Sequence, residues 1–374
     1  MIMHLIPCHG WPERGMLLRG GCPMPRPNSL PACWSGLRHL ALALFLLPLL
    51  LSRAGAADVT ADPAVRIEQD RAQQGDAGAQ YRLGVRMDQG LGIERDPAAA
   101  ARWYRKAAEQ GHARAAHNLG NLYLEGRGVE ADPVQARHWY ALAAESGYAP
   151  AMNNLGYLLA TGRGGEADPA AARQLYRQAA GLGEARAQLN LALMLMRGDG
   201  GPADPEAAVQ WLAKAAAQGL PAAQRELGLA LRDGRGSEVS ADGAFLWLSK
   251  AAMQGDAEAQ YELGRLHGKG DLVPLDYQLA AFWYHRAALQ GHARAQYLLC
   301  LSHALGRGVA SDAARAWAWC TLAQEGGVAE AASTLADIEP ALNGPDKERA
   351  QKILASLRES SEKVGISKSV ISNQ

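Results

Sequence analysis

Residues 115–147 read AAHNLGNLYLEGRGVEADPVQARHWYALAAESG, and this stretch decides the fold. Small and apolar residues stand at helical spacing ahead of Gly126, which predicts one amphipathic helix that ends in a turn. Asp132 and Pro133 predict the start of a second helix, because aspartate caps free backbone N–H groups and proline suits the first helical position. Gly147 then predicts a left-handed helix end. The stretch therefore forms a helix–turn–helix unit.

This unit recurs along the chain without an insertion. Its final glycine returns every 36 residues, at Gly75, Gly111, Gly147, Gly183, Gly219, Gly255, Gly291 and Gly327. A leucine of the first helix keeps the same period, at Leu83, Leu119, Leu155, Leu191, Leu227, Leu263, Leu299 and Leu335. Self-similarity at this period is typical of a solenoid, in which each unit buries its apolar face against its neighbours. We predict an all-α solenoid of helix–turn–helix repeats with a 36-residue period.

Two further recurring positions describe how the helices pack. The residue after the leucine is small in every unit, at Gly84, Gly120, Gly156, Ala192, Gly228, Gly264 and Cys300, which indicates a tight packing site. The second helix carries a tryptophan, at Trp103, Trp139, Trp211, Trp247, Trp283 and Trp319, with Leu175 in the remaining unit. Recurring alanines at helical spacing around these tryptophans predict a close approach between helices.

The repeats have atypical ends. Residues 58–75 contain a predicted capping helix that begins at Asp62-Pro63, and residues 76–327 hold seven full repeats. Residues 328–359 hold a partial repeat and a charged capping helix over 346–359, and terminal units of this kind keep a solenoid soluble. Residues 360–374 are polar, and we expect them to be disordered.

The first 57 residues lie outside the repeats. Residues 40–51 read LALALFLLPLLL, with Arg38 before them and Ala54-Gly55-Ala56 after them. This order predicts a cleaved signal peptide without a stable membrane anchor, and hence a periplasmic or secreted protein. A start at Met24 gives a basic segment of ordinary length, so we hypothesise that residues 1–23 are not translated.

Two cysteines remain once the signal peptide is removed, Cys300 and Cys320, and both lie in the seventh repeat. An exported protein with two cysteines on one helical hairpin can form a disulfide. Two small buried thiols are the alternative, because a disulfide requires the Cβ atoms to lie close together.

The unit A-x-x-x-L-G-x-x-x-x-x-G-x-G, followed by D-P-x-x-A-x-x-W-Y-x-x-A-A-x-x-G, resembles the Sel1-like repeat, a relative of the tetratricopeptide repeat. The resemblance covers about residues 64–359 and implies a right-handed α-solenoid that acts as an adaptor or scaffold. Secreted bacterial members of the family that it resembles include periplasmic regulators that restrain sensor kinases, an alginate-secretion scaffold and virulence-associated proteins. One cysteine-rich subgroup is associated with β-lactam hydrolysis, but this chain lacks its regularly paired cysteines.

Some first-helix positions do not repeat, although they lie off the predicted buried stripe. Divergence within a copied framework predicts that these side chains face a groove and contact a protein partner, such as an envelope or sensor protein. The alternative is that they are unconstrained surface residues. The predicted groove residues are Tyr81, His117, Asn121, Asn153, Tyr157, Arg225, Tyr261, Arg265 and Tyr297.

The sequence predicts neither an enzyme nor a nucleic-acid-binding protein. Formal charge is zero, with 38 basic and 38 acidic residues and no basic cluster. His267 and His303 share one position in successive repeats but have no evident third metal ligand, and the recurring aspartates are explained as helix caps. We therefore predict no catalytic, cofactor or metal site. The function expected is an exported protein-binding scaffold, and the alternative is a hydrolase acting on β-lactams or peptidoglycan.

Overall fold

A computed structural model of the chain describes residues 63–372, with side chains described as far as residue 360. Each repeat opens with a helix that we call the first helix: α2 (Ala77–Gln89), α4 (Ala113–Glu125), α6 (Ala149–Thr161), α8 (Ala185–Arg197), α10 (Pro221–Asp233), α12 (Ala257–Lys269) and α14 (Ala293–Leu305). The second helices are α3 (Pro97–Glu109), α5 (Pro133–Glu145), α7 (Pro169–Gly181), α9 (Pro205–Ala217), α11 (Ala241–Met253), α13 (Tyr277–Ala288) and α15 (Ala313–Glu325). Flanking these are α1 (Pro63–Gln73), α16 (Glu330–Ile338), the short 3₁₀ helix η1 (Glu339–Ala341) and α17 (Gly344–Ser372).

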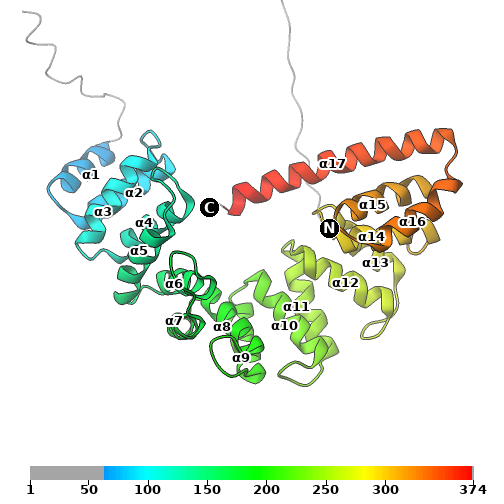
Figure 1. Cartoon of the computed structure of the whole chain (residues 1–374), viewed down its shortest axis with the longest axis horizontal. Coiled ribbons are helices and arrows are strands. Elements are labelled where there is room, and N and C mark those ends of the chain that lie inside the picture. Colours follow the sequence, from blue (N-terminus) through cyan, green and yellow to red (C-terminus); the bar gives the residue numbers. More distant parts are fainter. Residues whose placement is uncertain (1–62, 373–374) are drawn as a thin grey trace, which may run out of the picture. The chain divides into compact units, whose positions relative to one another are not determined.

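Each helix from α2 to α15 packs against the helix before it and the helix after it (Figure 1). The second helices begin as the sequence predicts: Asp96 Oδ1, for example, accepts a hydrogen bond of 2.9 Å from the backbone N–H of Ala99. The predicted all-α solenoid with a 36-residue period is confirmed over the residues described.

In five of the seven turns the second glycine lies at the contact between successive repeats. Gly128 has a φ of 70°, and a Cβ added there would lie 2.3 Å from the backbone carbon of Pro97 in the preceding repeat. The same clash, with the residue that begins the preceding second helix, would arise at Gly164, Gly200, Gly236 and Gly308. This glycine therefore sets the separation of the repeats as well as the shape of the turn.

The small-residue position of the first helix packs under an aromatic or leucine side chain of the second helix, 20 residues further on. A Cβ added at Gly84 would lie 2.6 Å from the Tyr104 ring, and one at Gly228 would lie 2.7 Å from Leu248 Cγ. The seventh repeat has Cys300 and Cys320 at these two positions. A disulfide there replaces the glycine–tyrosine contact that four of the other repeats have.

Buried glutamines link the first helix to the helix before it in five of the repeats. In each case the side-chain Nε2 donates to a carbonyl near the end of the preceding helix, as Gln188 does to Ala180 over 3.2 Å. The same role falls to Gln80, Gln224, Gln260 and Gln296. In four of these repeats the glutamine Oε1 accepts from a second glutamine 30 residues later, as Gln188 does from Gln218. These bonds satisfy polar groups that burial would otherwise leave unpaired.

The ends of the solenoid differ in part from the prediction. Helix α1 stands where the sequence places a capping helix, and α17 packs on α15 with Ala350 and Leu354 buried. Helix α17 continues to Ser372, so the expectation of disorder from residue 360 was wrong as far as residue 372. Residues 360–372 contain no proline and a single glycine, so nothing in them ends the helix. The predicted signal peptide lies outside the described residues.

Candidate protein-binding site

A cavity of about 730 Å³ opens at the N-terminal ends of three first-type helices, α12, α14 and α16. Glu258 and Tyr261 come from α12, whereas the connection between α15 and α16 and the first residue of α16 supply residues 326–330. The α14 side consists of His292, Ala293, Arg294, Tyr297 and Leu298. The cavity thus contains two of the predicted groove residues, Tyr261 and Tyr297, on successive repeats.

His292 connects the walls of this cavity through both of its ring nitrogens. Its Nδ1 accepts from the backbone N–H of Ala295 over 3.1 Å and so caps α14. Its Nε2 then carries the proton and lies 3.0 Å from Glu258 Oε2. The ring stacks on Tyr261, with centroids 4.4 Å apart. The hydrogen bonds and the stack together fix the imidazole and the Tyr261 ring as a rigid wall.

The same tyrosine–histidine stack occurs at the other end of the solenoid, between Tyr81 and His112, with centroids 4.6 Å apart. His112 likewise caps its helix, because Nδ1 accepts from the backbone N–H of Ala115. Burial lowers the pKa of His112 below its ordinary value. Gly78 stands where Glu258 stands in the sixth repeat, so this stack lacks the carboxylate. The stack is a structural element of the fold, and Glu258 is particular to the cavity.

Three polar side chains complete the cavity. Arg294 is exposed and has no carboxylate at ion-pair distance within the part of the chain that the structure describes. The Tyr297 hydroxyl lies 3.3 Å from Thr334 Oγ1, so the tyrosine joins α14 to α16. Glu330 opens α16, whose first turn has no side-chain cap. The cavity therefore offers aromatic surface beside both signs of charge, without a serine or cysteine among its described lining residues.

Sequence reasoning missed His292, Glu258 and Arg294. His292 and its equivalent His112 precede the first helix at one position of the repeat, and each follows a tyrosine by 31 residues. This shared tyrosine–histidine spacing is the signal in the sequence that indicates a stacked pair. Nothing in the sequence indicated a cavity, because its shape depends on the partial repeat that follows.

Other predicted groove residues join neighbouring first helices instead of opening toward solvent. Asn154 donates from Nδ2 to Asn121 Oδ1 over 3.3 Å and lies 3.1 Å from His117 Nε2. Asn190 donates to Asn153 Oδ1 over 2.9 Å. Burial lowers the pKa of His117. These side chains form a polar seam between α4, α6 and α8.

Ion pairs take the place of amides further along this seam. Arg225 of α10 contacts Asp256 Oδ2 at 2.7 Å, and Arg232 pairs with Glu262 of α12. Arg265 lies 3.1 Å from Glu262 Oε1 and 5.7 Å from the centre of the Tyr261 ring. The charges of these arginines are therefore already paired within the fold.

The expectation that all nine positions lie off the buried surface was wrong for Asn153 and Tyr261, each of which is only 7% exposed. The reason is that adjacent first helices pack closely and cover these positions. Tyr157 is 45% exposed and is open to solvent as expected. Tyr81 and Tyr297 are partly buried.

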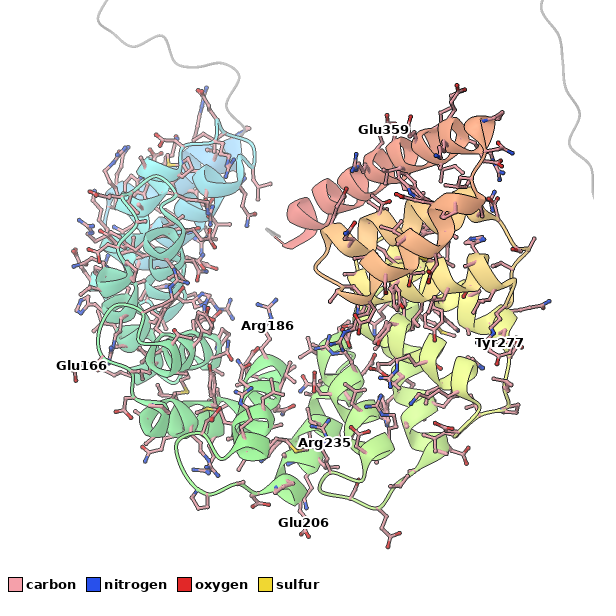
Figure 2. The ribbon with its side chains drawn as sticks, turned by 45° about the vertical axis from the view of Figure 1, so that its right-hand side comes forward. Glu166, Arg186, Glu206, Arg235, Tyr277 and Glu359 are labelled. Atoms are coloured by element: carbon pink, nitrogen blue, oxygen red, sulfur yellow. A yellow bond between two sulfur atoms is a disulfide. The ribbon has the colours of Figure 1, made fainter. Side chains whose placement is uncertain are left out.

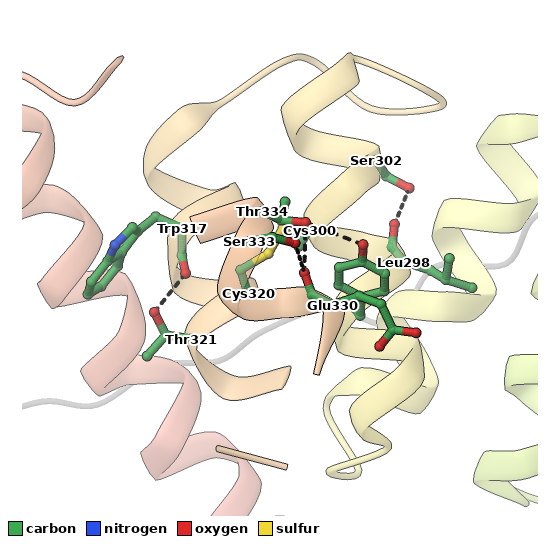
Figure 3. Close-up of a disulfide and its surroundings, with 10 residues drawn as sticks. Leu298, Cys300, Ser302, Trp317, Cys320, Thr321, Glu330, Ser333 and Thr334 are labelled. Atoms are coloured by element: carbon green, nitrogen blue, oxygen red, sulfur yellow. Dashed lines mark hydrogen bonds between the residues drawn. A yellow bond between two sulfur atoms is a disulfide. The ribbon is translucent and has the colours of Figure 1, made fainter. Parts of the chain in front are cut away.

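The structure joins Cys300 and Cys320 in a disulfide with a Cα–Cα distance of 5.3 Å (Figure 3). The bond links α14 to α15 behind the cavity wall, and both sulfur-bearing residues are fully buried. Glu330, Ser333 and Thr334 of α16 lie in front of it, where both hydroxyls donate to the Glu330 carbonyl.

His267 and His303 are both buried on neighbouring first helices, and His267 Nδ1 has no hydrogen-bond partner. Among the residues that the structure describes, no three histidine, cysteine or acidic side chains gather as metal ligands. Over the same residues, none of the helices combines the length and apolar character needed to cross a bilayer.

Comparison with known proteins places this arrangement in a family. The model of the Sel1 repeat matches seven consecutive segments, residues 77–112, 113–148, 149–184, 185–220, 221–256, 257–292 and 293–328. The chain is similar to the solved structure of a Sel1 repeat protein from Oxalobacter formigenes, at 33% identity over 73% of this chain and 79% of that one, with a TM-score of 0.63.

It is also similar to a protective antigen present in uropathogenic Escherichia coli strains, which displays an SLR fold. That match has 27% identity, covers 81% of each chain and gives a TM-score of 0.52. No curated protein sequence matches the chain significantly. Sel1 repeat proteins are generally non-enzymatic scaffolds that bind protein partners. Seven matched repeats over residues 77–328 show that the chain belongs to the Sel1 repeat family.

Proposed function

We propose that this chain is an exported scaffold that binds a segment of a protein partner in the cavity between α12, α14 and α16. The observation that carries the proposal is the wall formed by Tyr261, His292 and Glu258. The His292 ring stacks on Tyr261 with centroids 4.4 Å apart, and its Nε2 lies 3.0 Å from Glu258 Oε2. A fixed aromatic wall loses little conformational entropy on binding, which favours affinity.

The chemistry of the cavity supports a polypeptide ligand. A volume of about 730 Å³ suits a few side chains of a bound segment. Tyrosine and arginine, which are common anchors of protein interfaces, meet here as Tyr297 and Arg294. Because Arg294 has no carboxylate partner among the described residues, it is available to an acidic side chain of the partner.

Two observations support export. Residues 40–56 have the composition of a signal peptide, and the disulfide of the seventh repeat is of the kind that persists in oxidising compartments. Cell fractionation tests this part of the proposal. A chain whose first residue lies near position 57 in the envelope or medium supports it, and an unprocessed chain in the cytoplasm contradicts it.

Site-specific photo-cross-linking tests the cavity. A benzophenone amino acid at position 294 should yield one dominant protein adduct in cells. Position 186 is the control, because Arg186 holds the same place at the start of α8, is exposed and does not line the cavity (Figure 2). The proposal predicts an adduct at position 294 and none at position 186. Equal adducts at both positions, or none at position 294, would contradict it.

A further inference from the structure

A second cavity, of about 450 Å³, lies where the capping helix α17 packs on α15, and His285 of α13 and His303 of α14 also line it. It is separate from the proposed protein-binding site and is lined by different residues. His303 of α14 and Trp319 of α15 form its floor, at 6% and 3% exposure. The exposed side chains of Arg315, Arg349 and Lys352 surround the opening.

The charges at this opening are unbalanced. Arg349 pairs with Asp312, and Arg315 Nε lies 3.5 Å from the same carboxylate. Lys352 has no carboxylate at ion-pair distance within the described residues. Three cationic side chains thus share one carboxylate, and two positive charges remain without a counter-ion in the described part of the chain.

Apolar side chains of α17 line one side of the cavity. Ile353 and Leu357 of α17 are partly buried against the cluster that contains Trp319 and both cysteines. The disulfide follows Trp319 directly and ties α14 to α15, so the two repeat walls of the cavity are covalently joined. The volume lies within the range of small-molecule sites, and the lining combines apolar side chains with cations.

We propose that this cavity binds a phosphate monoester with an aromatic or alkyl substituent. The dianionic phosphate balances the two unpaired charges, with Lys352 and the two arginines as its ligands. The substituent packs against Trp319 and Ile353. The earlier repeats have no such site because α17, which supplies Arg349 and Lys352, covers the last repeat only.

Phenyl phosphate is the probe, added to the full chain and followed by NMR at the backbone amides of α15 and α17. We expect saturable shifts confined to these helices and α14. Benzoate, with the same ring and one charge, should bind at least about tenfold more weakly, and so should inorganic phosphate, which has no ring. Shifts spread over the whole chain, or the absence of saturation, overturn the proposal. Benzoate binding as tightly as phenyl phosphate overturns the assignment of a dianion.

A matched pair of variants locates the site. Lys352→Gln should weaken the binding of phenyl phosphate about tenfold, because among the three cations at the opening Lys352 is the one without a carboxylate partner. Lys347→Gln is the control, since this exposed lysine lies on α17 outside the cavity and removes the same charge. Equal affinity in the two variants overturns the proposal, since a general electrostatic effect would then explain the binding.

Discussion

Gln218 donates from Nε2 to Gln188 Oε1 over 2.9 Å, while Gln188 itself donates to the carbonyl of Ala180 over 3.2 Å. The pair thereby links the second helix of one repeat to both helices of the next. Two repeats lack both glutamines. The second repeat has Ala116 and Ser146 at the two positions, and the third has Met152 and Leu182. In the seventh repeat Gln296 is present without a partner, because Gly326 stands 30 residues later.

Breaking this pair on one side should destabilise the protein. Gln188→Met removes two hydrogen bonds, one to the Ala180 carbonyl and one from the Gln218 amide, although Gln218 Nε2 keeps its bond to the Gly183 carbonyl. The loss of two hydrogen bonds costs about 1–3 kcal/mol in the free energy of unfolding. The double variant Gln188→Met with Gln218→Leu copies the third repeat. Because the two side chains share one hydrogen bond, it should lose less stability than the sum of the Gln188→Met and Gln218→Leu losses. Denaturant unfolding measures both, and additive losses would contradict the coupling.

The small-residue position should not tolerate a methyl group. In Gly264→Ala the new Cβ would lie 2.5 Å from the Tyr284 ring, and overpacking of this kind costs about 1–3 kcal/mol. Gly181→Ala is the control, because nothing lies within 4 Å of a Cβ at the end of α7. That change should stabilise the protein by about 0.5–1 kcal/mol. Thermal unfolding measures both, and equal effects would refute the packing argument.

The disulfide should stabilise the last repeat. Replacing both cysteines with serine should cost about 3 kcal/mol, by analogy with loops of similar length. Cys300→Gly together with Cys320→Tyr restores the pair found at Gly84 and Tyr104 and should recover part of this loss. A thiol assay on the unreduced protein checks the bond itself, and two titratable thiols after unfolding would show that it is absent.

Acidification should destabilise the first half of the solenoid through His117. Burial lowers the pKa of this histidine in the folded state, so the unfolded state binds its proton more tightly. Stability is therefore fully present above the unfolded pKa of about 6.5 and falls as the pH drops below it. His117→Asn, which copies Asn153, should flatten this dependence. Melting temperatures measured from pH 7.5 to 5 test it, and identical slopes would contradict it.

The sequence predicts the framework well because the framework repeats. Caps such as Asp96, the glycine turns and the small-residue position follow from local chemistry that is copied in each unit. The site was less predictable, because the packing between adjacent helices decides which side chains are covered and which line a cavity. Tyr261 diverges between repeats, as a ligand contact would, yet it is buried beneath His292. Divergence along the first helices mainly reflects different polar links between repeats, as at Asn153 and Arg225.

The affinity of the partner cross-linked at position 294 tests the central claim most directly. Tyr297→Ala removes an aromatic side chain that lines the cavity and should weaken partner binding about tenfold or more. Tyr81→Ala removes the tyrosine at the same position of the first repeat, outside the cavity, and should leave the dissociation constant unchanged. Equal affinities for the two variants in folded protein would show that this cavity is not where the scaffold binds its partner.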